Sequence, residues 1–304
     1  MSARRPFASA LAVVLALLAL SACETIETLQ KGADTVDRNV AKAGSTAKTV
    51  TKTAGAVRST FGDISEQEEY YIGRSVAAMI LSRYKVYADD GLNRYLNTVG
   101  AAVAAYSDRP EIYAGYHVLA LDSAEVNALA APGGFIFLTR GLLKRCKDED
   151  TLADILAHEI GHVCAKHGLQ SIKKSRLVDA FRIIGQKAAD KYGPQELAEL
   201  TDIFEDALGD IAEKLIERGY DRKYEYEADD LAARFAARMR YDGGGLVDFL
   251  GTMVESDAGG ADLGWFKTHP GPGDRISRVQ GKVKAFKRDK ARTDRFKAAF
   301  KGLK

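Results

Sequence analysis

The feature that most constrains this chain is an apolar segment, residues 153–163, in which His158, Glu159 and His162 form the pattern H-E-x-x-H. Two histidines four residues apart point from the same face of a helix, so both imidazoles can reach a single point. The carboxylate between them is placed to contact a water on a metal ion. This arrangement is typical of a catalytic zinc site, with two nitrogen ligands, an open position for water and a base. The alternative is a packing helix with incidental histidines.

A catalytic zinc needs a third protein ligand, and two candidates follow the motif. His167 is near in sequence, but on a continuous helix it would lie about 140° around from His162. We therefore expect it to be a packing or surface residue. Further along, Glu225 and Asp229 share one helical face. One of these carboxylates can bind zinc while the other accepts a hydrogen bond from the second ring nitrogen of a ligand histidine. An acidic, solvated helix face is the alternative.

The segment before the metal helix has a β pattern. Residues 113–121 alternate and are rich in β-formers, and residues 127–131 lead through a Pro-Gly-Gly turn into residues 135–139. Such a hairpin can present its edge to a peptide substrate laid alongside as an added strand. A hairpin that only builds the core is the alternative. With helices expected over residues 66–84 and 90–106, the predicted fold class is α+β, mostly helical, with a small sheet beside the H-E-x-x-H helix.

Several motifs stand in order along the chain: Asn127-Ala128 with Gly133-Gly134, residues 139–143 (T-R-G-L-L), H-E-x-x-H, and Glu225-x-x-Ala228-Asp229. Together they resemble the zinc metallopeptidases of family M48, in their periplasmic, lipoprotein-type branch, over residues 64–279. The resemblance implies a zincin domain of the gluzincin type, one Zn²⁺ per chain and polypeptide substrates. It implies His158, His162 and Glu225 as zinc ligands, Glu159 as general base, Asp229 behind the ligands, and a substrate cleft along Asn127, Gly133, Gly134, Phe135, Ile136 and Phe137.

Two further residues take expected roles from the same resemblance. Arg222 stands where such enzymes often carry an arginine ahead of the ligand glutamate, and we expect it to orient the carboxylates. His269 belongs to a Thr-His-Pro segment similar to one in the family. It can approach the zinc as a fourth ligand that keeps the enzyme silent, or act as an oxyanion donor. A loop histidine that caps the next helix is the alternative for His269.

The first 62 residues predict export and anchoring. Residues 1–22 combine two arginines with an apolar run of the length of a secretory signal. They end in Leu-Ser-Ala before Cys23, which resembles the lipobox of bacterial lipoproteins. The resemblance implies lipidation of Cys23 and a membrane-anchored protein that faces the periplasm, with the outer membrane as the expected destination. An ordinary signal with a free Cys23 thiol is the alternative. Residues 23–62 are expected to be a tether, and residues 63–280 the metallopeptidase domain.

The charge is unevenly distributed along the chain. Residues 281–304 carry ten Lys or Arg against two Asp. Such a tail can lie on anionic lipid, bind an acidic partner or be solvated. The whole chain has a formal net charge of only +2 over 304 residues, which argues against a dedicated nucleic-acid binder. Whether Cys146 and Cys164 form a disulfide is open.

These features predict a zinc-dependent endopeptidase that hydrolyses peptide bonds in cell-envelope proteins, as quality control of misfolded or stalled proteins. The alternative is a lipid-anchored chaperone or assembly factor for outer-membrane proteins, linked to the outer-membrane assembly machinery, with a latent zinc site. The presence of Glu159 favours catalysis, because a purely structural zinc site needs no base.

Overall fold

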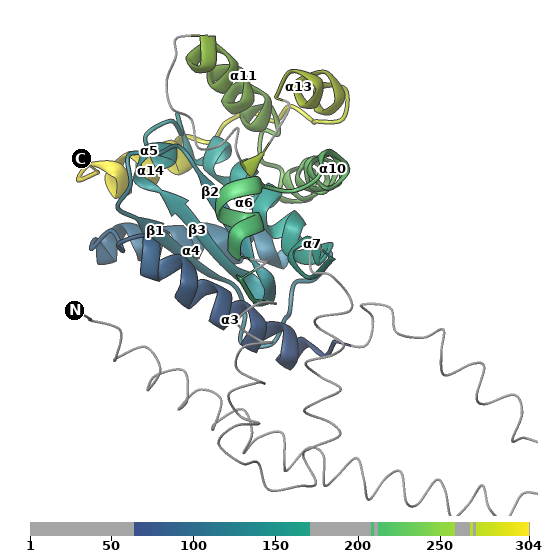
Figure 1. Ribbon diagram of the computed structural model, residues 1–304. Coiled ribbons are helices and arrows are strands. Elements are labelled where there is room, and N and C mark those ends of the chain that lie inside the picture. Colours follow the sequence, from purple (N-terminus) through teal and green to yellow (C-terminus); the bar gives the residue numbers. More distant parts are fainter. Residues whose placement is uncertain (1–63, 171–207, 210–211, 259–267, 270–271, 304) are drawn as a thin grey trace, which may run out of the picture. The chain divides into compact units, whose positions relative to one another are not determined.

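Three short strands form a mixed sheet in the order β1-β3-β2 (Figure 1). Strand β1 (His117–Leu121) pairs in parallel with β3 (Phe135–Thr139), and β2 (Ala128–Ala131) pairs antiparallel with β3. Strands β2 and β3 form the predicted hairpin. Its Pro132–Gly134 turn has both glycines at positive φ, a conformation that glycine adopts without steric cost. In the order β1-β3-β2, strand β2 is an edge strand of this sheet.

The computed structural model describes residues 64–170, 208–209, 212–258, 268–269 and 272–303. All of these fall within one of the two units into which the chain divides. The expected signal sequence, Cys23 and the tether lie outside the described residues. None of the helices described is both long and apolar enough to cross a bilayer.

Helices precede and follow the sheet. Helix α3 (Glu66–Arg83) begins with a capping box, in which Glu68 N donates to Ser65 Oγ and Ser65 N donates to Glu68 Oε2. Helix α4 (Asp90–Ala105) packs against β1 and α6. The elements that follow the sheet are α5 (Arg140–Leu143), α6 (Glu149–Cys164), α7 (His167–Gln170), a π-helical turn (Lys214–Arg218), α10 (Arg222–Met239), α11 (Gly244–Ala258), α13 (Pro272–Gln280) and α14 (Lys290–Phe300).

Helix α6, which carries the H-E-x-x-H motif, is the central helix of the unit. Every residue from Glu149 to Val163 is buried, and the helix packs against α10, α11, α4 and β2. Helix α10 approaches α6 closely at Gly161, where an added Cβ would lie 3.2 Å from the carbonyl oxygen of Ala228. The motif therefore lies in the interior, with α10 directly alongside.

The basic C-terminal segment packs onto the acidic beginning of α6. Three arginines from this segment form ion pairs with three consecutive acidic residues, and Phe296 of α14 is buried in the same core as α4 and α6. The sequence left open whether this basic segment binds lipid, binds an acidic partner or is solvated. For these three arginines, the acidic partners are residues of the same chain. The pairs are Arg288–Asp148, Arg292–Asp150 and Arg295–Glu149.

Candidate metal centre

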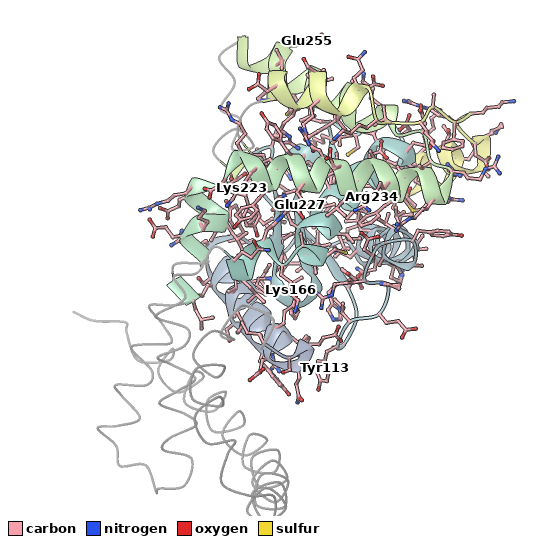
Figure 2. All side chains as sticks on the ribbon, turned by 90° about the vertical axis from the view of Figure 1, so that its right-hand side faces the viewer. Tyr113, Lys166, Lys223, Glu227, Arg234 and Glu255 are labelled. Carbon is pink, nitrogen blue, oxygen red and sulfur yellow. The ribbon has the colours of Figure 1, made fainter. Side chains whose placement is uncertain are left out.

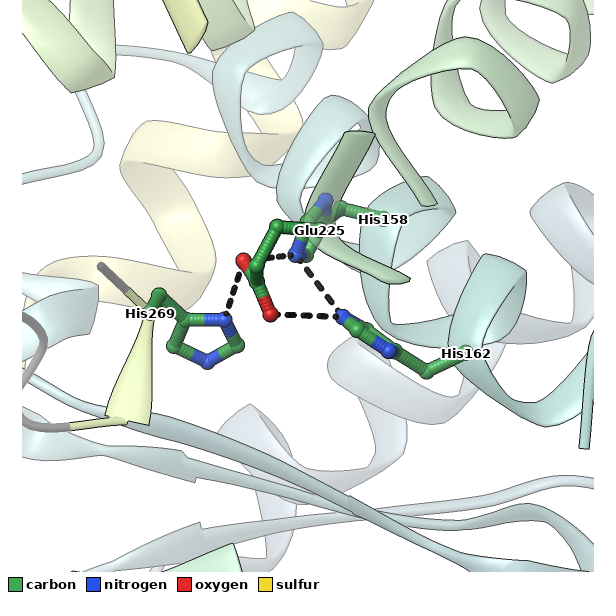
Figure 3. Close-up of side chains that lie close together, drawn as sticks. All are labelled: His158, His162, Glu225 and His269. Atoms are coloured by element: carbon green, nitrogen blue, oxygen red, sulfur yellow. Dashed lines mark hydrogen bonds and ion pairs between the residues drawn. The ribbon is translucent and has the colours of Figure 1, made fainter. Parts of the chain in front are cut away.

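Four buried side chains converge where α6, α10 and residues 268–269 meet (Figure 3). His158 and His162 come from α6, Glu225 from the first turn of α10, and His269 from the 268–269 segment. One potential ligand atom from each lies within 4.8 Å of all the others. The resemblance implied the first three as zinc ligands and His269 as a fourth ligand or an oxyanion donor, and the four side chains lie close together in the structure.

The distances between these atoms define a common centre. The Nε2 atoms of His158 and His162 are 3.1 Å apart. They lie 3.5 Å and 3.4 Å from Oε2 and Oε1 of Glu225, respectively, and His269 Nδ1 lies 3.0 Å from Oε2 of Glu225. Within the described residues, Oε1 of Glu225 has no hydrogen-bond partner although it is buried. Two imidazoles and a carboxylate fit the ligand preference of zinc.

Glu159 lies beside this cluster. Its side chain is fully buried, and neither oxygen has a hydrogen-bond partner among the residues described. His269 Nε2 lies 3.9 Å from Oε1 of Glu159. Burial raises the pKa of the Glu159 carboxyl. A buried carboxylate with open acceptor positions beside a metal centre is suited to proton transfer.

The carboxylate behind the cluster is held by an arginine that the sequence analysis did not select. Asp229 Oδ1 lies 2.9 Å from His158 Nδ1. Arg275 of α13 donates two hydrogen bonds to Asp229, at 2.8 Å and 2.7 Å, and its Nη1 lies 3.0 Å from Oε2 of Glu225. Arg275 is fully buried. It therefore contacts two buried carboxylates at once and binds Asp229 in the bidentate geometry that arginine–carboxylate pairs favour.

These contacts determine the pKa values at the site. Burial opposes ionisation of Asp229, but Arg275 and His158 outweigh it and lower the pKa of Asp229 to about 2. Burial likewise opposes ionisation of Glu225, yet His269 and Arg275 lower its pKa well below the usual range. For His158, burial and Arg275 lower the pKa, but the hydrogen bonds to Asp229 and Glu225 dominate and raise it to about 9. Both carboxylates are therefore anionic at neutral pH, as metal binding requires.

The expected role of Arg222 is wrong. Its side chain is 60% exposed and pairs with Asp274, not with the site carboxylates. Arg222 lies in the first turn of α10, where its exposed side chain extends to Asp274 of α13. Arg275 makes the contacts expected of Arg222. In the sequence, Arg275 is marked only by its position shortly after the Thr-His-Pro segment. The periodicity of apolar residues does not reveal which arginine is buried.

His167 is not among the converging ligand atoms, in agreement with the expectation from sequence, and its two ring nitrogens lie close to other polar groups. It is buried, and its Nδ1 lies 2.9 Å from His162 Nδ1 while its Nε2 lies 3.3 Å from Oε2 of Glu227. Burial lowers the pKa of both His162 and His167. The ring of Tyr220 stacks on His162 at 4.3 Å. Tyr220 was also missed, because only the fold brings it to α6.

The expected substrate cleft is partly corrected. Ile136 and Phe137 of the central strand β3 are 0% and 3% exposed, so neither lines an open cleft. Gly133 and Gly134 lie in the turn, where added Cβ atoms would collide with α3 and with residues 112–116, and Phe135 is half-buried beside Tyr70 of α3. Of the six expected cleft residues, Asn127 contacts the described segment that carries His269: its Oδ1 accepts a hydrogen bond from Thr268 Oγ1 at 2.7 Å.

Comparisons with known proteins identify the family of this chain. The sequence pattern of peptidase family M48 matches residues 91–283. The chain is 24% identical over 231 residues to the mitochondrial metalloendopeptidase OMA1 of Schizosaccharomyces pombe (strain 972 / ATCC 24843), covering 73% of this chain and 63% of that protein. It is 29% identical over 161 residues to the metalloprotease YcaL of Escherichia coli (strain K12), covering 53% and 59%. It is 23% identical over 229 residues to the beta-barrel assembly-enhancing protease of Yersinia pestis, covering 74% and 46%.

The chain spans less than two thirds of the length of each of these relatives. The family match nevertheless covers more than half of this chain. It includes α6, α10, α13 and the 268–269 segment, and thus every residue of the converging cluster. The chain therefore belongs to peptidase family M48, a family of metalloproteases.

Proposed function

We propose that this chain is a zinc-dependent endopeptidase that hydrolyses peptide bonds in cell-envelope proteins. The observation that carries the proposal is the convergence of His158 Nε2, His162 Nε2 and Glu225 on one point. Beside them Glu159 is buried with no hydrogen-bond partner in the described part of the chain. A structural metal site has no use for such a base.

In this proposal His158, His162 and Glu225 hold one zinc ion per chain. When bound, zinc polarises the scissile carbonyl and lowers the pKa of a coordinated water. Glu159 accepts the water proton and later delivers it to the leaving amine. Its pKa is raised by burial, which favours proton uptake. Asp229 and Arg275 fix the orientation of the ligands.

The substrate lies as an added strand along the outer edge of β2. The carbonyl oxygens of Ala128 and Ala130 contact side chains at this edge: His269 Nε2 lies 3.3 Å from Ala128 O, and Tyr220 Oη donates to Ala130 O at 3.2 Å. An extended peptide gains main-chain hydrogen bonds along such an edge. Because both carbonyls have side-chain partners, a substrate strand would have to replace these two contacts.

A second candidate function rests on His269. This one residue contacts both the Glu225 carboxylate and the β2 edge. As a fourth zinc ligand it would keep the site latent, and the chain would act as a lipid-anchored chaperone or assembly factor for outer-membrane proteins. In the active enzyme the same imidazole would instead serve as an oxyanion donor.

We further propose that the protein is an exported lipoprotein, anchored at Cys23, facing the periplasm at the outer membrane. The sequence of residues 1–23 supports export and lipidation. The name of the Yersinia pestis relative, a beta-barrel assembly-enhancing protease, supports a link to outer-membrane assembly, and misfolded or stalled envelope proteins are the substrates we propose. The proposed organisation is a signal peptide (1–22), a tether (23–62), a zinc metallopeptidase domain (63–280) and a basic C-terminal segment (281–304).

Zinc content and proteolysis of the full chain test the proposed function. We expect one zinc per wild-type chain and cleavage of an unfolded polypeptide such as casein. Glu159→Gln should keep the zinc and lose about 10²–10⁴-fold in cleavage rate, the usual contribution of a general base. Glu225→Ala should lose the zinc. A wild-type chain without zinc, or Glu159→Gln with wild-type activity, would contradict the proposal.

His269→Ala separates the two candidate functions. If His269 keeps the site latent, its removal should increase casein cleavage, whereas removal of an oxyanion donor should decrease cleavage about 10²–10³-fold. The second test asks whether the Glu159→Gln variant still functions in cells. Loss of function there supports proteolysis, and retained function supports the chaperone candidate.

A further inference from the structure

The second ring nitrogens of the two ligand histidines have different partners. His158 Nδ1 contacts the Asp229 carboxylate at 2.9 Å, whereas His162 Nδ1 lies 2.9 Å from Nδ1 of His167. We propose that His167 is a positioning residue, which holds the His162 imidazole in the orientation and tautomer that bind a metal through Nε2. The inference rests on the proposed metal centre.

The chain reaches this arrangement by a break in the helix after α6. Helix α6 ends at Cys164, and Lys166 adopts the left-handed conformation with a φ of 56°. Helix α7 then begins at His167, and Gly168 packs so tightly on Pro132 that an added Cβ would lie 3.0 Å from the proline ring. Because the helix is interrupted, the His167 ring folds back against His162 and does not project away from it.

The ligand geometry determines which ring nitrogens of His162 and His167 carry a proton. Nε2 of His162 is the atom that faces His158 and Glu225, so a neutral His162 that binds metal there carries its proton on Nδ1. It then donates to Nδ1 of His167. A neutral His167 carries its own proton on Nε2, which points at Oε2 of Glu227 at 3.3 Å. Each proton has an acceptor, and the tautomer of His162 is thereby fixed.

Two tyrosine rings hold the pair of imidazoles. Tyr220 stacks on His162 at 4.3 Å with an interplanar angle of 17°, and Tyr224 lies 4.4 Å from His167. These contacts restrict rotation of both rings. Packing alone explains where the rings lie, but it does not require the two Nδ1 atoms to face each other. A purely packing role for His167 is therefore the alternative that an experiment must exclude.

The series of contacts from His162 through His167 ends at Glu227 on the protein surface. Glu227 lies on the outer side of α10, between Lys223 and Arg234, with Lys166 nearby (Figure 2). Its side chain is 57% exposed, whereas that of His167 is 0% exposed. His158 is thus held by a buried carboxylate–arginine pair, while His162 is held by an imidazole whose far nitrogen faces an exposed carboxylate.

Zinc affinity of the full chain, measured by competition with a chromophoric chelator, tests the proposal. In His167→Asn, the side-chain amide lies about where Nδ1 of His167 lies, and its oxygen can accept the hydrogen bond from His162 Nδ1. His167→Gln places the same amide one bond further out, and His167→Phe keeps a ring without nitrogen. We expect the Gln and Phe variants to bind zinc about 10–100-fold more weakly and the Asn variant to stay within about threefold of wild type. His117→Asn, at an exposed position on β1, should leave the affinity unchanged.

Equal zinc affinity in wild type and His167→Phe, or equal losses in the Asn and Gln variants, would overturn the proposal in favour of packing. Urea unfolding of each metal-free variant shows whether it is folded. If the Phe variant does not fold, the Asn and Gln pair decides. A wild-type chain without zinc, or zinc retained by Glu225→Ala, would overturn the proposed function instead, so the two failures are distinguishable.

Discussion

At the scale of single residues, Arg275 is the buried cation on which the charge balance of the site depends. It contacts both Asp229 and Glu225 and is fully buried. Removing one partner of a buried ion pair leaves an uncompensated charge, which costs far more than the loss of an exposed pair. Arg222, with its exposed partner Asp274, provides an internal comparison.

We expect Arg275→Met to lower the free energy of unfolding by about 3–5 kcal/mol and Arg222→Met to change it by less than about 0.5 kcal/mol. Urea unfolding of both variants at pH 7 in the presence of a chelator measures the difference. Comparable costs for the two variants would contradict the importance assigned to Arg275.

A second buried group, Asp154, makes stability depend on pH. Its Oδ2 accepts a hydrogen bond from Leu246 N at 3.0 Å, and its Oδ1 has no partner within the described residues. Burial, with added repulsion from Asp150 and Asp242, raises the pKa of Asp154 well above its usual value. The unfolded chain therefore loses this proton at lower pH than the folded chain. Stability from this group is complete below the unfolded pKa and is lost as the pH rises through the folded pKa.

Asp154→Asn should therefore raise the melting temperature at pH 8 and change it little near pH 4. The amide cannot ionise but can still accept the hydrogen bond from Leu246. A gain of about 1 kcal/mol would correspond to about 2–4 °C for a domain of this size. Thermal unfolding of both proteins between pH 4 and pH 8 is the measurement. A difference independent of pH would show that ionisation of Asp154 is not the cause.

At the scale of elements, α14 stabilises the beginning of α6. Acidic residues suit a helix N-terminus, but Glu149 is 0% exposed and needs compensation when ionised. Tyr95 Oη and Tyr241 Oη donate hydrogen bonds to it, and Arg295 of α14 forms an ion pair with it. The C-terminal helix thus contributes to the helix that carries the metal ligands.

Arg295→Met should lower the free energy of unfolding by about 1–3 kcal/mol, less than a fully buried pair because the arginine is partly exposed. Lys290→Met is the matched control. Its pair with Asp294 is on the same helix but 85% exposed at the lysine, and its loss should leave the free energy of unfolding nearly unchanged. Chemical denaturation compares the two. An equal effect of both substitutions would mean that α14 does not stabilise α6 through Glu149.

At the scale of the whole molecule, the proposed metal couples three separate segments. Its candidate ligands come from α6, α10 and residues 268–269, and they can converge only in the folded chain. A metal that binds only the folded state stabilises it by mass action, by about 4 kcal/mol at a thousandfold excess over the dissociation constant.

Chelation should therefore lower the melting temperature of the wild-type chain by about 8–16 °C relative to the zinc-loaded protein, at about 2–4 °C per kcal/mol. Restoring zinc should reverse the change. Glu225→Ala should melt at nearly the same temperature with and without zinc. Scanning calorimetry measures both, and identical melting of the wild type with and without metal would contradict this coupling.

Much of this protein follows from local sequence patterns. The four-residue spacing of His158 and His162 brings two imidazoles to one face of any helix, and the Pro-Gly-Gly turn between apolar runs predicts the β2–β3 hairpin. Both patterns depend only on residues that are close together in the chain. The sequence by itself therefore determined the α+β class, the metal helix and the sheet beside it.

Only the tertiary structure decided which distant segments meet at these elements. The left-handed Lys166 turns His167 back onto His162, where a continuous helix would carry it away. Arg275 replaces Arg222 at the site because α13 packs on α10. The basic C-terminal segment pairs with the start of α6. The physical reason is the same in each case: periodicity predicts which side chains share a face, but the pairing of buried charges depends on how separate elements pack.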